Sequence, residues 1–108
     1  MGGTGTGESF RRNIASLKKY KINTRLIHDV TQPDTATVFM DQKLSLPVLA
    51  APITGTVTNM GGAIDELDYN RAVIAGCIKS GSIAFVGDGA TPDKYKIGLQ
   101  AISEYGGK

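Results

Sequence analysis

The sequence predicts an α/β domain built on parallel strands, either a parallel barrel or a doubly wound sheet. Two apolar runs, 44–54 and 82–86, each end in a polar turn that contains glycine, and a helical pattern lies between them. The core of each run does not alternate between polar and apolar residues, as is typical of parallel strands buried on both faces. The order of strand, turn, helix, strand and turn is typical of these two architectures.

The first element that we expect is a helix that begins at Ser9. Residues 1–8 are rich in glycine and threonine, and we expect them to form a flexible arm ahead of a partial domain over 9–108. Phe10, Ile14 and Leu17 are spaced by four and three residues, which places them on one face of a helix. Ser9 is the expected N-cap.

A β-hairpin and a strand are expected next. Residues 35–46 favour a hairpin that turns at Asp41 and Gln42. Pro47 is expected to begin the following strand, which runs to Pro52, because a proline is tolerated as the first residue of a strand. Residues 48–51 are expected to be buried on both faces of the sheet.

Two more helices flank the second predicted strand, 83–86. The first covers residues 65–80 and ends at Gly81, which suits the left-handed position after a helix. Its expected apolar stripe consists of Leu67, Ile74 and Ile78, and Val73 and Cys77 lie beside this stripe. The second has Thr91 as its N-cap and Pro92 in its first position, and Gly106 and Gly107 end it. Its expected inner face consists of Tyr95, Leu99 and Ile102.

The charge and cysteine content exclude several classes of function. The net charge is +2, and the basic residues between 11 and 21 have few aromatic neighbours, so we expect a solvated helix face and no nucleic-acid partner. The single cysteine, Cys77, permits no internal disulfide and no CxxC metal site. No run approaches the ~18 apolar residues of a membrane span, and no signal peptide is visible. We therefore expect a soluble, cytoplasmic protein that has no membrane partner.

Several residues that could carry chemistry have simpler explanations. The glycine-rich start has nearly the spacing of a phosphate-binding P-loop, but Glu8 stands where that motif needs lysine. His28 has no nucleophile placed near it in the sequence, so we expect a structural or exposed role. Asp65, Glu66 and Asp68 open a helix, where the macrodipole favours negative charge, and we expect no metal site there.

Residues 53–62 and 87–91 are the strongest candidates for a ligand site. Each segment follows a predicted buried strand, and chemistry in parallel α/β folds lies just past the carboxyl ends of the strands. Glycines there would let a flat ligand approach the backbone closely. The alternative, that both segments are ordinary connecting loops, stays open at this point.

Several segments together resemble one enzyme family. They are Arg25–Val30, Pro33–Thr35, Leu44–Val48, Ala51–Pro52, Asn59–Gly62 and Gly87–Ala90. In this combination the chain resembles the N-terminal part of the FMN-dependent α-hydroxy-acid oxidases and dehydrogenases, the family of glycolate oxidase and lactate oxidase. The sequences NMGG at 59–62 and GDGA at 87–90 are more similar to a clostridial-type branch.

The resemblance implies a (β/α)8 TIM barrel with FMN at the carboxyl ends of its strands, and such a barrel takes about 250 residues. The chain would then be an N-terminal fragment with an N-terminal helix, a small closing β-hairpin and about two βα units. The cofactor-binding positions that the resemblance carries over are Pro52, Ile53, Thr54, Gly55, Gly87 and Asp88. Many members of the family have serine where this chain has Gly87.

The resemblance also implies oxidation of a small-molecule 2-hydroxy acid to a 2-oxo acid, with reduction of FMN. No catalytic residue is assigned in this chain, because the family's acid–base residues lie in later strands. We therefore expect the isolated chain to be inactive, and to self-associate or to need the missing downstream half of the barrel. Two alternatives stay open. One is a non-catalytic truncated fragment that binds FMN or a partner chain, and the other is a fragment of a barrel similar to the FMN-dependent type 2 isopentenyl diphosphate isomerase.

Overall fold

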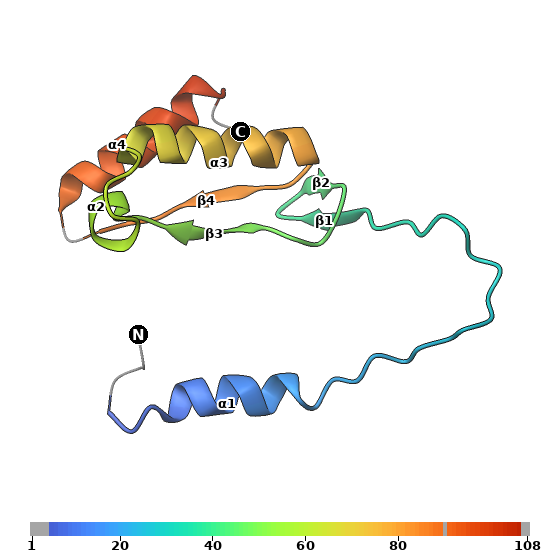
Figure 1. Ribbon diagram of the computed structural model, residues 1–108. Coiled ribbons are helices and arrows are strands. Elements are labelled where there is room, and N and C mark those ends of the chain that lie inside the picture. Colours follow the sequence, from blue (N-terminus) through green and yellow to red (C-terminus); the bar gives the residue numbers. More distant parts are fainter. Residues whose placement is uncertain (1–4, 90, 107–108) are drawn as a thin grey trace. The chain divides into compact units, whose positions relative to one another are not determined.

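The computed structural model describes residues 5–89 and 91–106 (Figure 1). The chain divides into two compact units, Met1–Gln32 and Pro33–Lys108. Half of the predicted flexible arm, residues 1–4, lies outside the described residues, and the predicted boundary between residues 8 and 9 stays a prediction. No helix among the described residues is long and apolar enough to cross a membrane.

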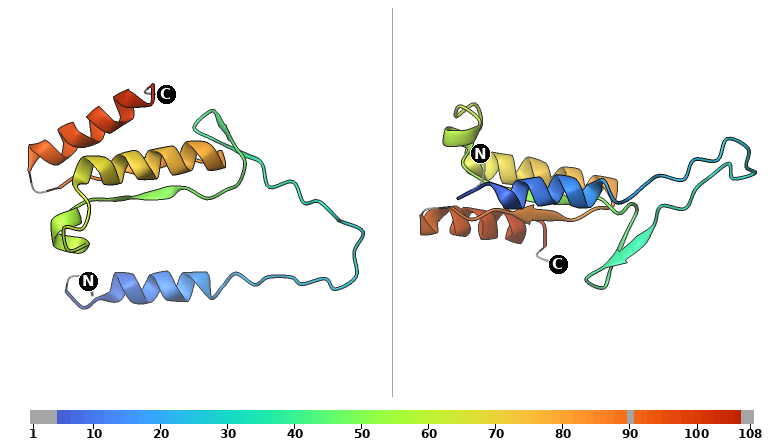
Figure 2. Two further views of the ribbon diagram at one scale, coloured as in Figure 1. Left: turned by 45° about the horizontal axis from the view of Figure 1, so that its top comes forward. Right: turned by 90° about the horizontal axis from the view of Figure 1, so that it is seen from below.

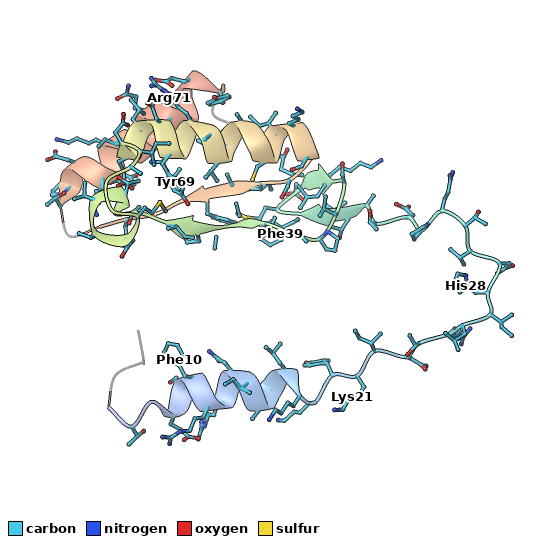
Figure 3. The ribbon with its side chains drawn as sticks, viewed as in Figure 1. Phe10, Lys21, His28, Phe39, Tyr69 and Arg71 are labelled. Atoms are coloured by element: carbon cyan, nitrogen blue, oxygen red, sulfur yellow. The ribbon has the colours of Figure 1, made fainter. Side chains whose placement is uncertain are left out.

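The first unit contains one helix, α1 (Glu8–Leu17), which starts one residue earlier than predicted. Gly7 is its N-cap with a left-handed backbone (φ 67°), and the helix has no side-chain cap, so the prediction of Ser9 as N-cap is wrong. Glycine adopts this conformation without strain, which lets the helix start before Ser9. The apolar stripe of α1 is exposed within this unit. Residues 18–36 form no helix or strand, and the exposed His28 lies on this segment (Figure 3).

The predicted hairpin is present as β1 (Thr37–Phe39) and β2 (Gln42–Leu44), which pair antiparallel with Phe39 opposite Gln42. The turn lies at Met40 and Asp41, so the prediction of Asp41 and Gln42 is wrong by one residue. Both turn residues have positive φ, 48° and 60°. This combination is typical of a type I′ turn, whose twist matches that of a hairpin. The hairpin geometry therefore overrides the unfavourable local preference of methionine.

The second sheet pairs β3 (Ala50–Ile53) parallel with β4 (Ala84–Val86), as the order of elements predicted. Strand β3 starts three residues later than expected because the Val48 amide donates to the Leu46 carbonyl at 2.9 Å, which closes a tight turn around Pro47. The prediction that residues 48–51 are buried on both faces is wrong, since Val48 and Ala51 are exposed. Two helices of the unit, α3 (Glu66–Ser80) and α4 (Pro92–Glu104), run side by side, and both contact β4 (Figures 1 and 2).

Helix α3 (Glu66–Ser80) connects the two parallel strands, and both of its ends follow from local sequence. Asp65 is the N-cap, and its carboxylate accepts a hydrogen bond from the Asp68 amide at 2.9 Å. Gly81 ends the helix with φ 67°, which confirms the predicted left-handed terminus. The predicted stripe is only partly buried: Ile74 lies in the core, whereas Ile78 is exposed.

Helix α4 (Pro92–Glu104) begins as predicted after Thr91, although the Thr91 side chain makes no cap hydrogen bond. Its predicted inner face is wrong for Tyr95 and Leu99, which are 60% and 46% exposed, whereas the third predicted residue, Ile102, is half-buried. Gly98 and Ala101 are the buried residues of the helix. A Cβ atom on Gly98 would lie 3.0 Å from Val86 Cγ2. Small residues therefore form the buried face because they let α4 approach β4 closely. Gly106 follows the helix with positive φ, and Gly107 lies outside the described residues.

An ion pair joins the two long helices. The Arg71 guanidinium of α3 donates two hydrogen bonds to the Glu104 carboxylate of α4, at 2.7 and 2.8 Å. Arg71 also contacts Asp68 at 3.0 Å (Figure 3 labels Arg71). The hydrogen bonds that Arg71 donates lower the pKa of the Glu104 carboxyl below its usual value. The hydrogen bonds that the Glu104 and Asp68 carboxylates accept from Arg71 raise the pKa of the Arg71 guanidinium. The pair is partly exposed, so it fixes the orientation of the helices more than it adds stability.

Candidate functional site

The structure brings the two predicted turns together at one edge of the sheet. Because β3 and β4 are parallel, their carboxyl ends lie side by side. In Figure 1 both arrows point towards the end where the short helix α2 (Thr56–Asn59) lies. The Thr54 hydroxyl, at the end of β3, donates a hydrogen bond to the Asp88 carbonyl that follows β4. Segments that are 34 residues apart in the chain thus form one continuous surface.

Gly87 is a glycine because the two strand ends touch at this position. A Cβ atom on the buried Gly87 would lie 2.5 Å from Thr54 Cγ2 and 3.1 Å from the carbonyl carbon of Ile53. Both distances are shorter than the ~3.5–4.0 Å at which carbon atoms attract one another. The structure therefore explains why this chain does not have the serine that the resemblance leads us to expect.

The turn after β3 is built around Gly55 and a short helix, α2 (Thr56–Asn59), which we did not predict from the sequence. Gly55 has φ 81° and is the N-cap of α2. The Asn59 side-chain amide donates to the Thr54 carbonyl at 2.6 Å, and the Thr58 hydroxyl donates to the Gly55 carbonyl at 3.2 Å. These bonds give the turn a defined conformation.

Glu66 holds this turn from the start of α3, and sequence reasoning missed it. The Gly55 amide donates to both carboxylate oxygens of Glu66, at 3.1 and 3.0 Å, and the Thr56 amide donates at 3.1 Å. We explained Glu66 only as a favourable charge at a helix start. No local pattern could have revealed these contacts, because they link residues ten and eleven positions apart across a loop.

Lys94, in the first turn of α4, spans the two turns and was also missed. A Cβ atom on Gly89 would lie 2.2 Å from the Cδ atom of Lys94, and one on Gly55 would lie 3.3 Å from its Nζ atom. The aliphatic part of the side chain therefore lies over Gly89, and the ammonium group reaches towards Gly55. A cation at this edge favours an anionic or electron-rich ligand.

The six predicted site residues differ in accessibility. Pro52, Ile53 and Asp88 are exposed, Thr54 is half-buried, and Gly55 and Gly87 are buried. The strand end thus presents an apolar surface, with Ile53 46% exposed, beside polar backbone and a lysine. Gly55 contributes its left-handed backbone conformation, since its amide is already bound by Glu66. Gly87 contributes the close approach of the two strand ends.

The other residues that could carry chemistry, His28 and Cys77, are not part of this edge of the sheet. His28 belongs to the first unit. The half-buried Cys77 lines an apolar cavity of about 320 Å³ with Ile74, Ile83, Ile102 and Tyr105, near the start of β4 and away from the candidate site. Within residues 5–89 and 91–106, no three His, Cys, Asp or Glu side chains are placed to hold a metal ion.

Comparison with known proteins identifies the family of this chain. Residues 1–90 match the family of FMN-dependent dehydrogenases. The chain belongs to this family. It is also 32% identical over 74 residues to an L-lactate dehydrogenase of Bartonella quintana (strain Toulouse), over 68% of this chain and 19% of that protein. The match therefore spans less than a fifth of the length of that curated relative, and no solved structure matches the chain.

The edge formed by the turns after β3 and β4 has features that fit a flavin. Flavin is a planar, largely apolar ring with polar atoms at its rim. The exposed side chains of Pro52 and Ile53 suit contact with such a ring, and the neighbouring Lys94 suits a ring that gains negative charge on reduction. The residues present therefore fit the cofactor that the family's description names.

Proposed function

We propose that this chain supplies the first wall of an FMN site in an oxidoreductase that converts a 2-hydroxy acid to a 2-oxo acid. The observation that carries the proposal is the junction of the turns after β3 and β4, where Thr54 bonds to the Asp88 carbonyl beside the exposed Ile53. Family membership and the L-lactate dehydrogenase relative support it. In this proposal β3 and β4 are the first two strands of a (β/α)8 barrel, and the NMGG and GDGA segments favour the clostridial-type branch.

Each residue at the edge has a distinct role in this proposal. When bound, FMN would supply the redox chemistry by accepting the electrons removed from the substrate. Pro52 and Ile53 would contact the ring and exclude water from it. Thr54 keeps the two strand ends in register through the Asp88 carbonyl. Lys94 would stabilise negative charge at this edge.

We also propose that the chain alone does not oxidise lactate or glycolate, because the resemblance to the family places its acid–base residues in later strands of the barrel. His28, the one histidine of the chain, lies in the other unit. A partner is therefore needed, either a second copy or the downstream half of the barrel. Exposed apolar side chains on β3 and β4 support this part of the proposal, since Ile53 and Phe85 remain exposed within their unit.

The unpaired thiol of Cys77 is in keeping with a cytoplasmic location.

Titration of the purified chain with FMN tests the cofactor site. We expect quenching of flavin fluorescence, and weaker binding by an Ile53→Asp variant, because a charge replaces the apolar contact. Val38→Asp is the matched control, since Val38 is an exposed valine on the hairpin and not at this edge. Absence of quenching by the wild-type chain, or equal loss in both variants, would contradict the proposal.

A chimaera tests the reaction. The aligned 74 residues of the Bartonella L-lactate dehydrogenase are replaced by those of this chain. We expect the chimaera to retain bound flavin and to oxidise L-lactate, whereas the chain alone with FMN should show no turnover. A chimaera that folds and binds flavin but oxidises no 2-hydroxy acid would count against this substrate class.

A further inference from the structure

Glu66 makes the contacts that connect α3 to the candidate cofactor edge. Its carboxylate accepts hydrogen bonds from the Gly55 and Thr56 amides at 3.0–3.1 Å. We propose that Glu66 is a positioning residue, which holds the turn after β3 in the conformation that FMN binding requires. This inference rests on the proposed function and adds a residue that does not itself touch the cofactor.

The three acidic residues at the start of α3 have different tasks, although their charges are alike. Asp65 caps its own helix through the Asp68 amide. Asp68 is exposed and pairs with Arg71. Glu66 is half-buried, and its carboxylate turns away from its own helix to the turn after β3. A favourable charge at a helix start needs no such partner, so the macrodipole does not account for the orientation of Glu66.

The turn that Glu66 holds has little stability of its own. Helix α2 has four residues, and its N-cap, Gly55, provides no side-chain hydrogen bond. A helix of this length is not stable by itself. The Glu66 carboxylate binds the first two amides of this turn, and charge-assisted hydrogen bonds of this kind are about twice as strong as neutral ones. Glu66 thus supplies from another element the cap that α2 lacks.

The turn is linked to the cofactor edge through the backbone. Thr54 directly precedes Gly55, accepts a hydrogen bond from Asn59 at its carbonyl and donates one to the Asp88 carbonyl. A turn released from Glu66 would therefore loosen the junction between β3 and β4 as well as the exposed Ile53 beside it. Loss of the Glu66 carboxylate should therefore lower the affinity for FMN, although Glu66 does not contact the cofactor.

Two measurements on the full chain test the inference, with Glu66→Gln as the variant and Asp68→Asn as its matched control. Both substitutions remove one negative charge from the first turn of α3, but only the first removes the charged acceptor for the turn. We expect amide hydrogen-exchange protection at Gly55 and Thr56 to fall about tenfold in Glu66→Gln, and FMN to bind about tenfold more weakly in the fluorescence titration. Protection at Ile74, in the core of α3, should stay unchanged, and Asp68→Asn should behave like the wild type.

Each other outcome contradicts the inference in a recognisable way. Unchanged protection at Gly55 and Thr56 would show that Glu66 does not hold the turn. An equal loss at Ile74 would show that Glu66 stabilises the whole unit and has no specific positioning role. If the wild type and Glu66→Gln bind FMN equally well, this inference fails and the proposed function stands. If the wild-type chain binds no FMN, the proposed function fails and the inference fails with it.

Discussion

Substitution of Gly87 by alanine tests whether the close approach of the two strand ends requires a glycine. The added Cβ atom would lie 2.5 Å from Thr54 Cγ2, at least about 1 Å inside the optimal separation of two carbon atoms. Gly87 has no positive φ, so alanine meets no backbone strain there and would gain about 0.4–1 kcal/mol from the unfolded state. Overpacking of this kind costs about 1–3 kcal/mol. From the midpoints of these two ranges, we therefore expect a net loss of about 1.3 kcal/mol in the free energy of unfolding.

A second substitution should relieve part of this overlap. Thr54→Ser removes the Cγ2 methyl group but keeps the hydroxyl that donates to the Asp88 carbonyl. The loss of stability in the double variant Thr54→Ser/Gly87→Ala should therefore be smaller than the sum of the two single losses, by a coupling energy of about 0.5–1 kcal/mol. The rescue stays incomplete because the Ile53 carbonyl carbon is also within 3.1 Å of the new atom.

Urea unfolding followed by circular dichroism provides the measurement for all four corners of this double-mutant cycle. Gly76→Ala is the control, because a Cβ atom on Gly76 in α3 meets nothing within 4 Å. This control should raise stability by about 0.5–1 kcal/mol, through helix propensity alone. A Gly87→Ala variant as stable as Gly76→Ala, or a double variant with no rescue, would refute the reasoning about the strand junction.

Two further predictions concern the rest of the second unit. Replacing Met40 and Asp41 by Asn and Gly should raise the free energy of unfolding by about 1 kcal/mol, because both residues have positive φ in a type I′ turn. Met40 is exposed, so its replacement removes no buried contact. A lower thermal midpoint would contradict this interpretation of the turn. Arg71 lowers the pKa of the Glu104 carboxyl in the folded chain. The carboxylate therefore stabilises the fold at pH values above its ordinary pKa of 4.5, and this stabilisation is lost as the pH falls through the lower pKa of the folded state. Glu104→Gln should therefore flatten the acid limb of a plot of urea midpoint against pH, and an unchanged slope would contradict the role of the ion pair.

Local chemistry made several elements of this protein predictable. Gly81 ends α3 because glycine accepts the left-handed backbone there. Pro92 opens α4 because its missing N–H has no partner to lose in the first turn. The hairpin and the two parallel strands followed from apolar runs bounded by turn residues. The position of the candidate site could be predicted from the two parallel strands, because parallel strands place their carboxyl ends at one edge of the sheet.

Burial was less predictable than secondary structure. Periodicity identified Tyr95, Leu99 and Ile102 as an inner face, yet only Ile102 is partly buried. The fully buried residues of α4 are Gly98 and Ala101. A pattern of apolar residues shows which faces can be buried. How closely a helix approaches a strand decides which of them is buried, and that distance depends on residues such as Val86 in another element.

The sequence by itself determined the order of the elements, several of their ends and the two turns in which to look for a site, because these depend on neighbouring residues. Only the tertiary structure showed that Gly87 must be a glycine, that Lys94 spans both turns and that Glu66 binds the Gly55 amide. These facts are contacts between residues that are 5 to 39 positions apart in the chain. No local pattern encodes such contacts, since they exist only once the strands have paired and α3 has packed beside them.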